Sequence, residues 1–279
     1  MIQLGEYNDL TIIRLTDFGW FLEDEEQNEV LLPNKFVTED MEAEQKINVF
    51  IYKDSEDRIT ATTQKPFITL NEFACLKVKE VNKMGAFMDW GLDKDLLVPY
   101  REQQPKMIED EYYVVRLVHD EKTDRLYASG RLNKYLITDH LSVEEGEKVD
   151  IIIIDETDLG YKAIIDDAHL GLIYKNETFQ PIEIGEKMEA WVKNIREEDG
   201  KIDLSLQEQG YAHIEPSAQR ILEILKENGG FLDLNDKSDP EKIVRIMEMS
   251  KKTFKKSLGS LYKQRLISLE NNGIRLVVK

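Results

Sequence analysis

The chain lacks the residues and runs that several classes of protein need. It has one cysteine among 279 residues, which excludes an internal disulfide framework and fits a reducing compartment. Its four histidines show no spacing typical of a zinc site. No apolar run approaches the ~20 residues of a membrane span, and the first residues lack the basic start and apolar middle of a signal peptide. A glycine-rich phosphate loop, a nucleophile elbow and a recognisable pair of acids are also missing. We therefore expect a cytoplasmic protein that is not an enzyme and that needs no metal or cofactor.

Short alternating runs dominate the first three quarters of the chain. Between Cys75 and Arg131 every second residue of each run is apolar, which is the pattern of a half-buried strand. Gly85 separates the first two runs, and glycine permits a sharp bend or a close approach of two backbones. Five such runs in about 60 residues match the size and strand count of a small OB-type barrel.

The same pattern occurs once upstream and once downstream. The bend is marked by three glycines, spaced 66 and 75 residues apart: Gly19, Gly85 and Gly160. The last turn carries three cations, spaced 67 and 76 residues apart: Arg58, Arg125 and Lys201. Because the bend glycines and the cations of the last turn recur at nearly equal spacings, we expect three related domains, at residues 1–63, 64–140 and 141–213.

In the remaining residues, 214–279, the apolar residues recur with a period of about 3.6 instead of 2, which indicates helices. Asp239 and Ser250 stand at the N-cap positions of the second and third expected helices. An Asn-Gly turn at 272–273 then predicts a terminal hairpin. Three helices followed by a hairpin indicate an α+β winged-helix domain, with residues 251–263 as its recognition helix.

Net charge divides unevenly along the chain. The total is −18, with −10 in residues 1–63, −1 in 64–140, −11 in 141–213 and +4 in 214–279. The stretch 250–265 has six basic residues and no acidic one: Lys251, Lys252, Lys255, Lys256, Lys263 and Arg265. A face of one sign favours contact with phosphates, whereas the alternative is an ordinary solvated lysine face. Lysines act as point charges, so we expect salt-sensitive binding with weak sequence preference.

Three short motifs resemble the S1 RNA-binding domain. They are the Met-Gly-Ala-Phe bend at 84–87, the Gly-Leu-Ile strand at 171–173 and the closing Lys-Ile-Asp-Leu-Ser strand at 201–205. Three such copies followed by a basic helical domain resemble, over essentially the whole chain, the conserved virulence factor B family of bacterial cytosolic proteins. This resemblance implies a multidomain fold of three tandem all-β OB-fold (S1-like) barrels and a winged helix. It also implies an RNA-binding regulator of gene expression, including virulence genes.

The resemblance extends to candidate binding residues on the barrels. Phe87 matches the family's exposed aromatic after the bend, and Tyr174 stands at its usual histidine position, although Met84 and Pro99 depart from the pattern. The other candidates are basic or aromatic residues of the second and third copies: Lys79, Arg125, Tyr161, Lys162, Lys193 and Lys201. Ordinary outward-facing barrel residues remain the alternative for this set.

Two classes of partner therefore remain open. The first is single-stranded RNA, with a DNA-binding regulator acting through the winged helix as a variant of it. The second is protein: acidic barrels could form a scaffold that meets basic proteins, for instance at a ribosome surface. No membrane partner is expected.

Overall fold

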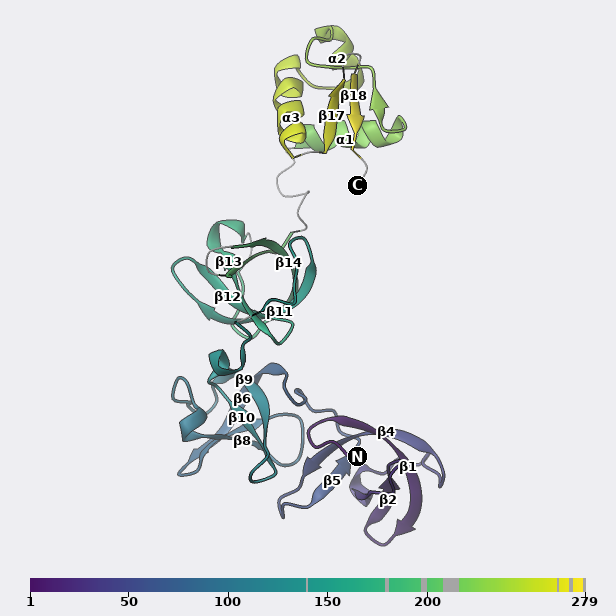
Figure 1. Ribbon diagram of the computed structural model, residues 1–279, viewed down its shortest axis with the longest axis vertical. Helices are drawn as coiled ribbons and strands as arrows, with labels where there is room; N and C mark the ends of the chain where they lie inside the picture. The colour runs from purple at the N-terminus through teal and green to yellow at the C-terminus, as the bar shows by residue number, and fades with distance from the viewer. Residues whose placement is uncertain are drawn as a thin grey trace. The chain divides into compact units, whose positions relative to one another are not determined.

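The computed structural model describes residues 1–138, 140–178, 181–196, 200–207, 216–264, 266–270 and 273–277. The chain separates into two compact units, residues 1–206 and 207–279. The strands of the first unit fall into three groups of five, which Figure 1 shows in purple, blue and teal. The finer boundaries suggested by the repeat, at residues 63, 140 and 213, stay predictions.

The first group forms a closed barrel in the order β1-β2-β3-β5-β4, with every pairing antiparallel except β3 with β5. Its strands are β1 (Tyr7–Thr16), β2 (Gly19–Glu23), β3 (Glu29–Pro33), β4 (Lys46–Lys53) and β5 (Ile59–Thr62). The third group repeats this topology with β11 (Lys148–Glu156), β12 (Gly160–Ile165), β13 (His169–Tyr174), β14 (Lys187–Ile195) and β15 (Ile202–Ser205). The OB-type barrels expected from the alternation are therefore confirmed.

The second group differs in one respect. It is a five-stranded sheet in the order β10-β9-β6-β7-β8, made of β6 (Phe73–Asn82), β7 (Gly85–Asp89), β8 (Leu96–Pro99), β9 (Tyr112–Asp120) and β10 (Arg125–Ser129). The strand order is that of the other two barrels, but β8 and β10 form no ladder within the part of the chain that the structure describes. This repeat is a half-open barrel.

Short 3-10 helices accompany the barrels. One follows the third strand of each repeat: η1 (Asn34–Phe36), η2 (Tyr100–Glu102) and η4 (Lys175–Glu177). A further turn, η3 (Leu132–Tyr135), follows β10.

The three bend glycines are confirmed as points of close backbone approach. A Cβ on Gly19 would lie 2.0 Å from the carbonyl oxygen of Leu32, and one on Gly160 would lie 2.0 Å from that of Ile173. At Gly85 the corresponding distance, to the Val98 oxygen, is 2.2 Å. The bend of each barrel therefore packs directly on its third strand, and only glycine fits there.

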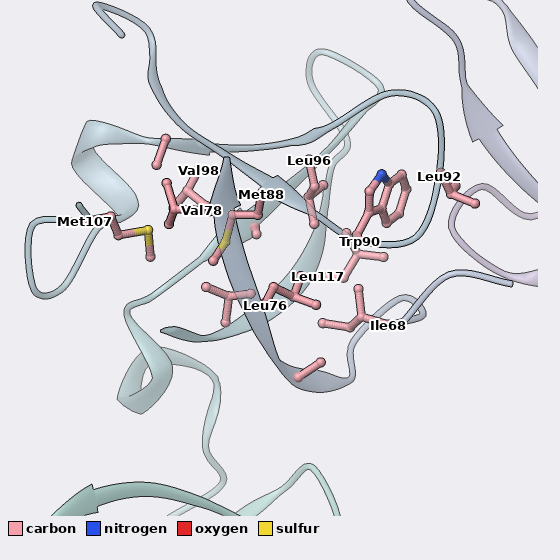
Figure 2. Close-up of a cluster of buried hydrophobic side chains, with 14 of the residues drawn as sticks. Ile68, Leu76, Val78, Met88, Trp90, Leu92, Leu96, Val98, Met107 and Leu117 are labelled. Carbon is pink, nitrogen blue, oxygen red and sulfur yellow. The ribbon is translucent and has the colours of Figure 1, made fainter. Parts of the chain in front are cut away.

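The cores of neighbouring barrels meet within the first unit. Side chains from β6, β7, β8 and β9 converge with Trp90 in the second barrel (Figure 2). Phe50 and Tyr52, from β4 of the first barrel, belong to the same buried cluster, and the Phe50 ring meets Trp90 edge-on with centroids 5.9 Å apart. A second buried cluster joins Phe73 of β6 to Ile152 of β11.

The second unit is a winged helix. It contains α1 (Pro216–Glu227), β16 (Phe231–Leu232), α2 (Pro240–Met247), α3 (Lys251–Lys263), β17 (Ile267–Glu270) and β18 (Gly273–Leu276). The two expected caps are present: Asp239 accepts from Glu241 N at 2.8 Å and Ser250 from Thr253 N at 3.1 Å. In Figure 1, α3 lies alongside β17. The Asn271-Asn272 part of the expected hairpin turn lies outside the described residues. Among the described helices of the chain, none is both long and apolar enough to cross a membrane.

Candidate nucleic-acid interface

A pocket of ≈ 700 Å³ opens on the outer face of the third barrel. Strand register builds its floor, because Lys162 of β12 pairs with Leu172 of β13, and Leu172 pairs in turn with Asp203 of β15. These three side chains thus form a row across adjacent strands. Along β13 the outward side chains are Leu170, Leu172 and Tyr174, two residues apart, as the pleat requires.

Hydrogen bonds hold the polar groups of this pocket in place. The Arg196 guanidinium reaches Asp203 Oδ1 at 2.9 Å and also donates to the Tyr174 hydroxyl. The Lys162 ammonium contacts Asp155 Oδ2 at 2.8 Å. The hydrogen bond from Arg196 therefore fixes the hydroxyl end of Tyr174, and the Tyr174 side chain lines the pocket.

The remaining lining is mostly apolar. Leu159, at the tip of the β11–β12 turn, is 67% exposed, and Leu170 is also exposed. His169 is fully buried, and its Nε2 accepts from the backbone N–H of Ser142 at 3.2 Å. The lining thus combines apolar walls and an aromatic ring, which suit a flat base, with three cations and two carboxylates, Asp158 and Asp203.

The pocket brings together three of the five sequence-based candidates of this barrel: Lys162, Tyr174 and Lys201. Tyr161 points the other way and packs against the barrel core, because neighbouring residues of a strand face opposite sides. Lys193 is exposed on β14 and is not among the lining residues.

Sequence reasoning missed Arg196 and the leucines of β13. The signal for the leucines was present in the sequence: Leu170, Leu172 and Tyr174 share one face by period two. Arg196 had no local signal, because its partners lie in two other strands.

On the second barrel, Phe87 and Arg125 line a smaller pocket of ≈ 280 Å³. Arg125 hydrogen-bonds Asp57 of the first barrel, and the Lys94 ammonium lies 3.6 Å from Asp57 Oδ1. Burial alone would raise the pKa of Asp57, but these two cations outweigh it and hold that pKa below its usual value. Asp57, a carboxylate of the first barrel, thus already pairs with Arg125 and Lys94 on this face.

Lys79 is engaged in a similar way within the second barrel. Its ammonium lies 2.8 Å from Asp95 Oδ1, and this hydrogen bond is the main reason that the pKa of Lys79 is raised. The second barrel therefore presents fewer open cations than its composition suggests.

The lysines of α3 divide by position. Lys251 is half-buried, and its ammonium donates to the Ser238 carbonyl at 2.8 Å, whereas the Lys255 ammonium lies 3.8 Å from Asp236. Four lysines of the helix are exposed: Lys252, Lys255, Lys256 and Lys263. Within the described part of the chain, Lys252 and Lys263 form no ion pair. Arg265 lies outside the described residues.

Comparisons of the sequence with protein families and with relatives agree with this architecture. A family model for a CvfB-like winged helix domain matches residues 219–276, and one for an S1 domain matches residues 4–64. The uncharacterized protein YitL of Bacillus subtilis is 30% identical over 96% of this chain and 91% of its own length. Proteins named conserved virulence factor B, from Staphylococcus epidermidis and Staphylococcus aureus, are each 26% identical over 99% of this chain and 95% of theirs. A crystal structure described as a multidomain protein with nucleic acid binding domains, from Streptococcus pneumoniae, is 26% identical and covers 98% of both chains, with a TM-score of 0.46.

Proposed function

This chain belongs to the conserved virulence factor B family, and we propose that it is a non-enzymatic regulator of gene expression that binds single-stranded RNA. Both matched domain types, S1 and winged helix, are nucleic-acid-binding modules, which supports nucleic acid as the partner. Beyond nucleic-acid binding, the proposal names RNA rather than DNA as the partner. It also assigns a regulatory role that includes virulence genes.

The third-barrel pocket is the observation that carries the proposal. Tyr174 supplies a flat face on which an unstacked base can rest, and Leu172 supplies apolar floor beside it. Lys162 and Lys201 line the same pocket and would meet the phosphates of the strand. A base can enter such a pocket only when it is out of a duplex, so the pocket favours single strands.

The winged helix contributes a second contact in this scheme. Lys252 and Lys263 bind phosphates as point charges and read no base edges, which predicts weak sequence preference. The first two barrels contribute less in this scheme, because a first-barrel pocket is lined by Asp24, Glu25 and Glu26 and the Phe87 pocket of the second barrel is smaller, at ≈ 280 Å³.

Replacement of Tyr174 by alanine tests the role of the pocket. Stacking is worth ~1–3 kcal/mol per base, so Tyr174→Ala should weaken binding of a fluorescein-labelled pyrimidine-rich RNA about 5- to 150-fold. Tyr174→Phe keeps the ring and should bind nearly as well as the wild type. A matched control is Tyr112→Ala, which removes a 63% exposed tyrosine from the second barrel. Unchanged binding by Tyr174→Ala, measured by fluorescence anisotropy, would refute the role of the pocket.

Protein binding is a second candidate function, and it rests on the first barrel. Its net charge of −10 accompanies two exposed apolar side chains at the β1–β2 turn, Leu15 and Phe18. An acidic surface with apolar contacts suits a basic protein, for example at the ribosome. Retention of the full chain on ribosomes, together with its loss in Phe18→Asp, would favour this candidate.

A further inference from the structure

Gly259 lies in the middle of α3 on its exposed side. Its backbone is helical and its φ lies outside the left-handed region. A Cβ built on it would meet nothing within 4 Å. The fold therefore gives no steric or conformational reason for glycine at this position, in contrast to Gly85 and Gly160.

Glycine at this position lowers the stability of the domain. It loses more conformational freedom on helix formation than alanine does, and alanine would fit without contact. Glycine is also the residue that allows another molecule to approach a backbone closely. A partner that approaches α3 would supply a role for Gly259 that the contacts of the domain do not.

The helical geometry places Gly259 within the row of exposed lysines. At about 100° per residue, Lys252, Gly259 and Lys263 fall within an arc of about 40°, and Lys256 lies close to it. The buried side chains Phe254 and Leu261 point in nearly the opposite direction. At ~1.5 Å per residue, Gly259 stands about 10 Å along the axis from Lys252 and about 6 Å from Lys263.

We propose that Gly259 is the point where the sugar–phosphate backbone of RNA approaches α3 most closely, with Lys252 and Lys263 binding phosphates on either side. This inference rests on the proposed RNA-binding function. A polyanion is favoured over an apolar partner because four exposed lysines and one exposed aromatic, Tyr262, share this side of α3, and no acidic residue occurs in the helix. Close approach of a phosphate to the helix increases its interaction with both lysines.

Two substitutions that add bulk at Gly259 test this inference. In the full chain, Gly259→Ala and Gly259→Leu should leave the melting temperature unchanged or raised, because both residues favour helices more than glycine. At 0.15 M salt, Gly259→Ala should weaken RNA binding roughly fourfold, about the loss of one phosphate contact, and Gly259→Leu should weaken it further. Gln219→Leu, which adds an apolar side chain at an exposed position of α1, is the matched control and should bind normally.

The outcomes separate this inference from the function on which it rests. Normal binding by Gly259→Leu, with weakened binding by Lys252→Ala/Lys263→Ala, would refute the role of Gly259 and leave RNA binding intact. Failure of the wild type to bind RNA would overturn both. Stronger competition by poly-glutamate than by unlabelled RNA would assign the face to an acidic protein instead, which also overturns the inference.

Discussion

Removal of two exposed lysines of α3, Lys252 and Lys263, should change the salt dependence of RNA binding by a calculable amount. Each phosphate contact on a single strand adds about 0.7 to the magnitude of the slope of log affinity against log salt concentration. Lys252→Ala/Lys263→Ala should therefore reduce that slope by about 1.4. At 0.15 M salt the loss of two phosphate contacts corresponds to a roughly 14-fold loss of affinity, or about 1.6 kcal/mol. Lys251 is not used in this test because its ammonium is bonded to Ser238.

The assay is fluorescence anisotropy with labelled single-stranded RNA between about 50 and 300 mM KCl. The matched control is Lys106→Ala/Lys122→Ala, which changes the net charge equally at exposed positions of the second repeat. A double variant of α3 that keeps the wild-type slope would refute phosphate binding by this helix. An equal loss in the control would show that total charge, and not the α3 face, governs binding.

Two further predictions concern the junction of the first two barrels. Phe50→Ala should cost about 3–5 kcal/mol of unfolding free energy, because it empties a site that is fully buried against Trp90; chemical denaturation that shows a loss below about 1 kcal/mol would contradict the shared core. Hydrogen bonds from lysines of the first barrel are the largest of the interactions that lower the pKa of Asp93 and Asp124. The stability that these pairs contribute is therefore fully present above the pKa of aspartate in the unfolded chain, about 3.9. It is lost as the pH falls through the lower pKa values of the two carboxyl groups in the folded state. Trp90 fluorescence in a variant without the other two tryptophans should stay constant from pH 7 to 5 and change below about pH 4; a transition near pH 6 would contradict this assignment.

Most of the fold could be predicted from local patterns. The period-two runs, the three bend glycines and the two helix caps each depend on residues close together in the chain, and each appears in the structure as expected. The half-open second barrel could not be predicted, because pairing of β8 with β10 depends on how two distant strands meet and not on the alternation within either.

The candidate site was predictable only in part. Lys162, Tyr174 and Lys201 were found through the S1 motif and lie in one pocket. The partner of Arg125 was not predictable, because Asp57 lies 68 residues away on another barrel. Position on a helix likewise did not distinguish Lys251, which contacts Ser238, from Lys252, which is exposed. Such differences arise from tertiary contacts that charge and periodicity do not encode.

Cross-linking of the full chain to RNA that contains 4-thiouridine would locate the bound strand most directly. The third-barrel peptides that carry Tyr174 and the α3 peptides around Gly259 should carry the cross-linked nucleotides, and both should lose them in excess unlabelled RNA. Cross-links confined to the first barrel, or their absence from both predicted peptides at saturating RNA, would contradict the proposed interface.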